Sequence, residues 1–391
     1  YNILKDDWIY LENEYRDLAG LYFNGRLQEN SIYPDLRFLE NNLKNKILAD
    51  FFHNENKYQK TSYKSVYDYG ITRYGNLIVN NVIRSSIEKI FNKKIEDLHF
   101  LAAKLAPMDR MVMFDLPLMK EFQKIKYFRE KIAFTEQKLL PLDFSSNKKS
   151  LYPKKHGTWR ILNAIQKDLK KNNIRVFNNS IVEKFEFKQD QIFQCRIKNV
   201  IDNKKNIIEL DGNVLWTIGI PKLPLLLNID LPKAKPDPPK KTVLANFITD
   251  NPIHAGELQY FHCYDPKLKT FRVNNYINYS PNAQNKKGFP VCAELLVDFH
   301  DNINKKLLDT AENELKIMGV LKEQKIVFKR LEVLEEAFPM PTLKNITLIN
   351  SIRTKIKDLN LKNLIISGIL SKETLFFQRH VLPDMYKKLF I

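Results

Sequence analysis

The stretch Val214-Leu-Trp-Thr-Ile-Gly-Ile-Pro221 is a short apolar run that ends in a glycine and a proline. An apolar run of this length, closed by turn residues, is typical of a buried strand in an α/β sheet. A second run of the same kind, Leu364-Ile-Ile-Ser-Gly368, lies near the other end of the chain. We therefore expect both runs to lie in one sheet-containing domain, despite their separation in sequence.

The residues before Val214 predict how the chain reaches this strand. A turn at His156-Gly157 precedes a helical pattern from Thr158 to Leu169. Alternating apolar residues then predict four short strands, at 174–177, 180–187, 193–200 and 206–210. Helix, meander and return strand together predict an inserted crossover in an α/β sheet.

The rest of the chain has a different character. Asn24-Gly25 between apolar residues predicts a tight hairpin turn, and residues 36–140 have mostly helical spacing. Alternation at 242–248, 258–263, 270–277 and 291–297 predicts an antiparallel sheet, followed by a helix at 302–318 and a strand at 326–333. A last helix is expected at 380–389.

Composition and motifs exclude several classes of protein. The chain has 391 residues, and 44% of them are hydrophobic, which is ordinary for a globular protein. No two of the 11 glycines are two residues apart, so the G-x-G-x-x-G dinucleotide fingerprint is absent. The sequence also lacks a Walker loop, a G-x-S-x-G elbow and an H-E-x-x-H motif. No apolar run is long enough for a membrane span.

The charge and the cysteine content of the sequence indicate which binding partners and which cellular compartment to expect. The 63 Lys plus Arg exceed the 45 Asp plus Glu, but the lysines are dispersed along the chain, so we expect no specific nucleic-acid partner. Three widely separated cysteines fit a reducing compartment, and we predict a cytoplasmic protein. His254, His262 and Cys263 come closest to a metal-ligand group, but their spacing is not that of a zinc site, and no metal is predicted.

Several sequence segments resemble those of the superfamily of flavin-containing amine oxidases and protoporphyrinogen oxidases, which includes UDP-galactopyranose mutase. They are Tyr152-Pro-Lys-Lys-His-Gly-Thr-Trp-Arg-Ile-Leu162, Asn179-Ser-Ile-Val-Glu-Lys-Phe185 and the stretch from Val214 to Pro221. Tyr67-Asp-Tyr69 with Arg73-Tyr-Gly75 is similar to the helical part of the family's substrate domain, and Ala337-Phe-Pro-Met-Pro341 to the approach to its last flavin-domain strand.

The resemblance implies an FAD cofactor and a set of residues that contact it. These residues are Val182 beside the adenine, Thr217 and Gly219 at the end of the return strand, and Gly368, Phe377 and Gln378 in the closing segment. The same glycines also fit ordinary turns, and Val182 and Thr217 also fit a sheet core. Three arginines are the candidate substrate contacts, because a guanidinium binds carboxylate or phosphate through two hydrogen bonds. They are Arg73, Arg110 and Arg272.

The sequence departs from the family at two points. Relatives begin with a βαβ unit whose glycine turn binds the cofactor diphosphate, and this chain resembles them only beyond that unit. Many relatives also have Gly-Asp where this chain has Gly368-Ile369. We therefore expect the chain as given to bind FAD weakly and to be less soluble or less stable than a version extended at its N-terminus, which we expect to bind FAD tightly.

Together these observations predict an α/β fold with an α+β substrate domain. A Rossmann-like, FAD/NAD(P)-binding type of flavin domain (residues 151–220 and 335–391) is interleaved with a helical and antiparallel-sheet substrate domain (residues 1–150 and 221–334). The resemblance implies an FAD-dependent oxidoreductase acting on a small organic substrate. Two alternatives stay open: a redox-neutral flavin mutase acting on a nucleotide sugar, and a non-catalytic binding protein. No acid–base pair can be named, and the oligomeric state is not predicted.

Overall fold

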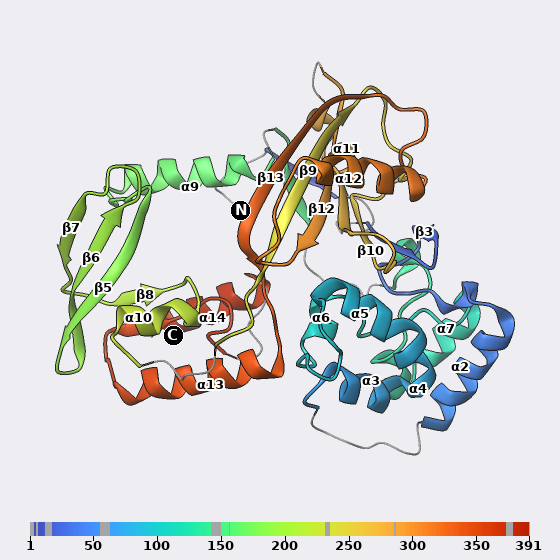
Figure 1. The fold of residues 1–391 in the computed structure, drawn as a ribbon, viewed down its shortest axis with the longest axis horizontal. Coiled ribbons are helices and arrows are strands. Elements are labelled where there is room, and N and C mark those ends of the chain that lie inside the picture. Colours follow the sequence, from blue (N-terminus) through green and yellow to red (C-terminus); the bar gives the residue numbers. More distant parts are fainter. Residues whose placement is uncertain are drawn as a thin grey trace. The chain divides into compact units, whose positions relative to one another are not determined.

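The computed structural model describes residues 4, 7–11, 18–54, 63–141, 150–155, 157–230, 235–284, 287–372 and 378–390. The chain forms two compact units and passes between them three times (Figure 1). Unit 1 comprises Tyr1–Asp168 and Pro238–Pro341, and unit 2 comprises Leu169–Asp237 and Thr342–Ile391. Each unit is therefore assembled from segments that are distant in sequence. The domain ranges expected from the sequence stay a prediction.

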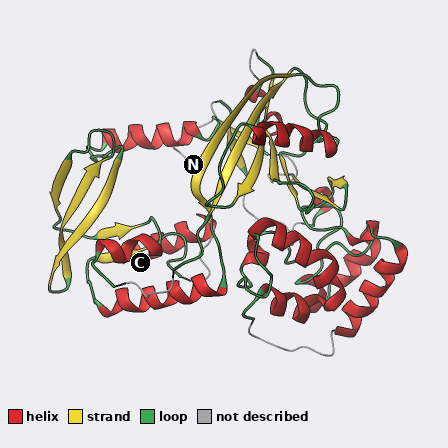
Figure 2. Ribbon diagram, viewed as in Figure 1, coloured by secondary structure: helices red, strands yellow, loops and turns green. Residues whose placement is uncertain are grey.

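Helices form one part of unit 1, as the spacing of apolar residues predicts (Figure 2). Ser65 starts α3 with a capping box, in which its hydroxyl accepts from the Asp68 N–H and the Asp68 carboxylate accepts from the Ser65 N–H. The apolar side chains of these helices form one buried cluster. The elements are α2 (Asn41–Asn54), α3 (Val66–Tyr74), α4 (Asn76–Ile78), a π-helical turn (Val79–Ile83), α5 (Arg84–Phe91), α6 (Ala102–Leu105), α7 (Leu116–Phe122) and α8 (Lys126–Arg129).

A seven-stranded sheet forms the other part of unit 1. Its strands, in spatial order, are β13 (Ile326–Phe338), β9 (Lys240–Thr249), β12 (Phe289–Val297), β11 (Thr270–Asn275), β10 (Tyr260–Cys263), β2 (Ala19–Phe23) and β3 (Arg26–Gln28). All neighbours are antiparallel except β2 and β10, which are parallel. Asn24 and Gly25 have φ of 50° and 72°, as the expected hairpin turn requires.

Alternation along the strands gives the sheet two different faces. Val243, Ala245 and Phe247 of β9 point to one side and join Val273 and Ala293 in an apolar cluster. Helix α12 (Lys306–Ile317) packs on this face through its own apolar stripe. The opposite face bears polar and aromatic side chains at the alternate positions of β10, β11 and β12. A separate two-stranded pairing joins β1 (Trp8–Tyr10) to β4 (Leu151–Pro153).

Unit 2 contains the meander and the two apolar strands expected from the sequence. Strands β5 (Ser180–Lys188), β6 (Gln191–Asn199) and β7 (Lys205–Glu209) form an antiparallel sheet. Strands β8 (Val214–Trp216) and β14 (Leu364–Ile366) pair in parallel, which confirms that they share a sheet. The remaining helices are α9 (Trp159–Lys171), which carries the chain from unit 1 into unit 2, α10 (Leu223–Leu226), α13 (Leu343–Asp358) and α14 (Gln378–Phe390).

One strand expected in this region is absent. Residues 174–177 form no strand, and Ile174, Val176 and Phe177 are about half exposed. The segment 151–168 lies in unit 1, whereas β8 and β14 lie in unit 2. The sequence analysis did not predict the helix α13.

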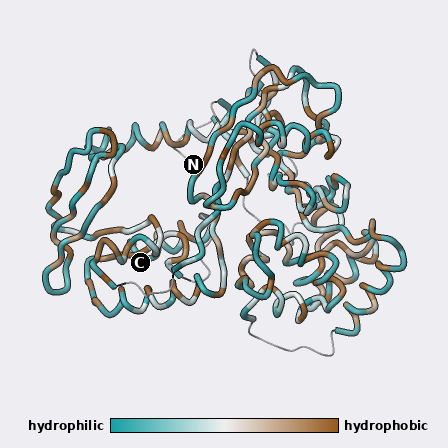
Figure 3. The backbone as a smooth tube through the Cα atoms, in the orientation of Figure 1, coloured by the Kyte–Doolittle hydropathy of each residue, from teal (hydrophilic) through white to brown (hydrophobic). Residues whose placement is uncertain are grey.

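Hydrophilic and hydrophobic residues alternate along the described part of the chain (Figure 3). Within the part that the structure describes, no helix combines the length and the apolar character that a membrane span requires.

Candidate functional site

The carboxyl ends of β8 and β14 lie side by side in unit 2. The parallel register pairs Val214 with Leu364 and Trp216 with Ile366, so the chain leaves both strands at the same edge. The N–H of Ser367 donates to the carbonyl oxygen of Trp216 at 2.9 Å, which extends the pairing past the strands. Ligands of open α/β sheets bind outside the carboxyl ends of parallel strands. This edge is therefore the candidate cofactor site.

Glycines shape both turns at this edge. Gly368 has φ of 102° and Gly219 has φ of 103°, values that L-residues rarely adopt. A Cβ on Gly368 would clash with the carbonyl oxygen of Thr217, whereas a Cβ on Gly219 would come no closer than 3.6 Å to the carbonyl oxygen of Ile369. Gly368 thus permits close packing of the two turns, and Gly219 leaves space beside them.

The groups around these glycines offer both apolar surface and hydrogen bonds. The side chains of Ile218 and Ile369 are 66% and 47% exposed. The hydroxyl groups of Ser367 and Ser371 are buried and have no hydrogen-bond partner among the described residues, so each remains available to a ligand atom. The indole N–H of Trp216 donates to the Gly219 carbonyl at 2.8 Å and fixes the first turn.

The structure brings three of the predicted cofactor contacts together. Thr217, Gly219 and Gly368 meet at the edge described above. Val182 lies in β5, opposite Ile197, and is partly buried against the core of unit 2. Gln378 is the first residue of α14. Phe377 lies outside the described residues, so its predicted contact is not tested.

One cation near this edge was missed by the sequence analysis. Arg353 of α13 donates from Nε to the Leu370 carbonyl at 3.0 Å, and so holds the turn that follows β14. It also lines a cavity of about 370 Å³ together with Lys357 and Ser371. A signal was present in the sequence, because Arg353 falls on the helical stripe that Ile349 and Ile356 define.

The polar face of the unit 1 sheet holds the predicted substrate contact Arg272. Its Nε and Nη2 both donate to Oε1 of Glu294, at 3.0 and 2.8 Å, and Asn274 donates to the same oxygen at 2.7 Å. The neighbouring Tyr264 hydroxyl is buried and has no hydrogen-bond partner in the part of the chain that the structure describes. Burial raises the pKa of the Cys292 thiol to about 12 and that of Tyr264 well above its usual value. Both groups stay protonated near neutral pH, so they can donate hydrogen bonds but not act as bases.

Arg73 and Arg110 lie in the helical part of unit 1. Arg73 donates to the backbone carbonyls of Asp109 and Glu130 and lies over the rings of Tyr69 and Tyr74. These contacts occupy much of its guanidinium with groups of the protein itself. Arg110 is half-buried and within electrostatic range of Tyr74. A substrate role for the three arginines stays a prediction.

His262 lies on the same polar face as Arg272. The effect of its surroundings on its pKa can be tested by experiment. Burial, with the positive charges of Arg272 and Lys89, lowers its pKa to about 3. The unfolded chain binds a proton below about pH 6.5, whereas folded His262 stays neutral, so the stability that this residue contributes is lost as the pH falls from 6.5 toward 3.

We expect the pH dependence of stability to shrink when His262 is replaced by phenylalanine. Between pH 7.5 and 4.5 the wild-type free energy of unfolding should fall by about 2–3 kcal/mol more than that of His262→Phe. Urea unfolding at both pH values measures this difference. His300→Gln, at an exposed histidine of the same unit, is the control. An equal fall in wild type and His262→Phe would show that the folded state protonates His262 readily.

Three solved structures have a fold similar to that of this chain. The chain is similar to reduced UDP-galactopyranose mutase, with a TM-score of 0.66, 12% identity, and coverage of 91% of this chain and 73% of that one. It is similar to a putative protoporphyrinogen oxidase from Exiguobacterium sp. 255-15, with a TM-score of 0.59, 14% identity, and coverage of 93% and 77%. An oxidoreductase from Methanosarcina mazei gives a TM-score of 0.51, 11% identity, and coverage of 94% and 80%.

These comparisons confirm the predicted resemblance at the level of the fold. The chain shares its mixed α/β fold with the mutase and with the putative protoporphyrinogen oxidase. No protein-family model matches the sequence. No curated protein matches it either.

Proposed function

We propose that this chain binds FAD at the carboxyl ends of β8 and β14 and acts as a flavin-dependent oxidoreductase on a small organic molecule. The observation that carries the proposal is the parallel pairing of these strands with a positive-φ glycine in the turn after each. The fold shared with a mutase and two oxidoreductase-type proteins supports it.

The residues at this edge fit the ring end of a flavin. Gly219 leaves space for a flat group, Ile218 and Ile369 supply exposed apolar surface, and the Ser367 hydroxyl is unpaired. When bound, the cofactor would carry the redox step by accepting or delivering a hydride. The diphosphate is matched less well, because the sequence has no G-x-G-x-x-G turn to present backbone N–H groups.

The polar face of unit 1 would bind and orient the substrate. Arg272, held by Glu294, presents a cation of fixed geometry, and Tyr264 has a free hydroxyl. Protonated Tyr264 and Cys292 cannot serve as bases near neutral pH. Such a face would bind a molecule without itself supplying a base, which agrees with the lack of a recognisable acid–base pair in the sequence.

The runner-up function is a redox-neutral flavin mutase acting on a nucleotide sugar. The similarity to UDP-galactopyranose mutase favours it, and arginines would then bind phosphates. Turnover without an electron acceptor separates the mutase from the oxidoreductase. A non-catalytic binding protein of the same fold would lack the flavin spectrum altogether.

FAD titration tests the site. We expect a dissociation constant in the micromolar range, because apolar and backbone contacts remain while the diphosphate is poorly matched. Ile218→Glu should weaken binding at least tenfold, since it places a charge where the ring would lie. Quenching of flavin fluorescence measures the affinity.

Leu225→Glu is the matched control, because Leu225 is also 66% exposed and lies in the same unit. It should change the affinity less than twofold. No binding at 1 mM FAD, or equal weakening by both substitutions, would contradict the proposed site.

A further inference from the structure

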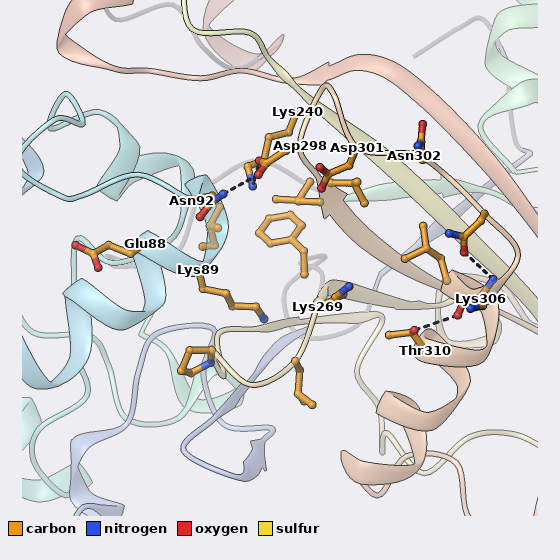
Figure 4. A pocket seen from close by; sticks show the side chains of 18 residues that line it. Glu88, Lys89, Asn92, Lys240, Lys269, Asp298, Asp301, Asn302, Lys306 and Thr310 are labelled. Carbon is orange, nitrogen blue, oxygen red and sulfur yellow. Dashed lines mark hydrogen bonds and ion pairs between the residues drawn. The ribbon is translucent and has the colours of Figure 1, made fainter.

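Unit 1 contains a cavity of about 700 Å³ that plays no part in the proposed flavin function. Its walls come from the last turn of α5, the turn between β10 and β11, the end of β12 with the loop that follows, and the first turn of α12 (Figure 4). Arg73, Arg110 and Arg272 are not part of its lining.

The floor of this cavity is apolar. Ile90, Leu268, Phe271 and Leu307 line it, and each is buried in the protein. They come from α5, the β10–β11 turn, β11 and α12, so the fold itself brings them together. An apolar group placed on this floor would leave water and pack against side chains that are already held in place.

A partly buried cation lies beside the floor. The Lys89 side chain extends from α5 along the cavity (Figure 4). Its ammonium group donates to the carbonyl oxygens of Cys263 and Thr270, the second at 2.7 Å, and contacts the Cys263 sulfur at 3.4 Å. Among the described residues it has no ion pair with a carboxylate. Burial accordingly lowers the pKa of Lys89, and an anion nearby would stabilise its charged form.

Two further cations stand at the rim without partners. Lys269 and Lys306 both line the cavity and are exposed. In the described part of the chain neither ammonium group has a hydrogen bond or an ion pair, so both are available to a ligand.

The acids on the lining are mostly neutralised. Asp298 is paired with Lys240 at 2.9 Å and also accepts from Asn92 at 2.6 Å. Glu88 is paired with Arg84 at 3.2 Å. Asp301 is exposed to solvent at the edge. The cavity therefore offers more free positive than negative charge above an apolar floor.

We propose that this cavity binds an organic anion with an apolar body, of the class of medium-chain carboxylates. The head group lies between Lys269 and Lys306, Lys89 supplies a partly buried positive charge, and the body packs on Phe271 and its apolar neighbours. Rim lysines screened by water fix the position of the head group, and the floor provides the selectivity for an apolar ligand.

Calorimetric titration of the full chain with sodium decanoate, without FAD, tests this proposal. We expect one binding site. The double variant Lys269→Ala/Lys306→Ala should weaken binding at least tenfold without affecting the fold, because neither side chain has a partner to lose. Lys267→Ala/Lys305→Ala is the matched control, since these exposed lysines lie two residues from Lys269 and one residue from Lys306 but off the lining. It should change the affinity less than twofold.

Two comparison ligands test the two halves of the site. Decan-1-ol, which lacks the charge, and inorganic phosphate, which lacks the apolar body, should each bind at least tenfold more weakly than decanoate. The proposal is overturned if decanoate does not bind at millimolar concentration, if both double variants weaken binding equally, or if either comparison ligand binds as well as decanoate. Failure of FAD binding would leave these results unchanged.

Discussion

Replacing Gly368 by alanine is expected to lower the free energy of unfolding of unit 2 by about 4 kcal/mol and to abolish FAD binding. Gly368 has φ of 102°, where an L-residue is strained, and the added Cβ would overlap the carbonyl oxygen of Thr217. The Thr217 oxygen belongs to the backbone and the backbone fixes the position of the Cβ, so no side-chain rotation can relieve the overlap. The turn after β14 would have to move away from β8, which separates the two halves of the candidate cofactor site.

Alanine substitutions at two other glycines of unit 2 serve as comparisons for Gly368→Ala. Gly219→Ala keeps the strain of a φ of 103° but has open space, and should cost about 2 kcal/mol. At Gly212 nothing lies within 4 Å of a Cβ and the backbone is not in the positive-φ region, so Gly212→Ala should cost less than about 0.5 kcal/mol. Urea unfolding followed by tryptophan fluorescence gives the order. A cost for Gly368→Ala within 1 kcal/mol of that for Gly212→Ala would show that the two turns do not pack as described.

Much of the local structure could be predicted because it depends on short-range pattern. Alternation along residues 242–248 and 291–297 identified β9 and β12, and the same alternation buries Ala245 and Ala293 on one face. Two short apolar runs identified β8 and β14, since strands of a parallel sheet are covered on both faces.

Other features depend on contacts that pattern alone does not reveal. Residues 174–177 have the composition of a strand, but they pair with no strand in the described part of the chain and are exposed. The parallel pairing of β2 with β10 joins residues that lie far apart in the chain. The polar face around Arg272 exists because three separate strands place polar residues in register.

The helix α13 was missed although the sequence contains signals that predict a helix there. Thr342 follows Pro341 and its hydroxyl accepts from the Asn345 N–H, as an N-cap does. Ile346, Ile349 and Ile352 continue at helical spacing. The missed helix carries Arg353, so the same omission removed a cation from the candidate site.

A second large effect is expected in unit 1, at Glu314 of α12. Its carboxylate accepts from the N–H groups of Lys269 and Thr270, both at 2.7 Å, and from the Thr270 hydroxyl at 2.6 Å. Glu314 is buried. Its hydrogen bonds hold the end of the β10–β11 turn against α12. Glu314→Ala leaves these donors without an acceptor and creates a void. We expect the free energy of unfolding of unit 1 to fall by about 4 kcal/mol.

A substitution at Glu312, two residues earlier on α12, distinguishes the effect of losing a buried hydrogen-bond acceptor from the effect of losing a negative charge. Its carboxylate makes ion pairs with Lys316 at 2.7 Å and Lys329 at 3.1 Å, near the surface. Glu312→Ala removes the same charge from the same helix, and surface ion pairs contribute little, so its cost should stay below about 1 kcal/mol. Glu314→Gln should fall between the two, because an amide keeps one acceptor oxygen and turns the other into a donor facing N–H groups. Urea unfolding of the three variants measures the order. Equal costs for Glu312→Ala and Glu314→Ala would mean that the turn is held by its own backbone, and that Glu314 acts only through its charge.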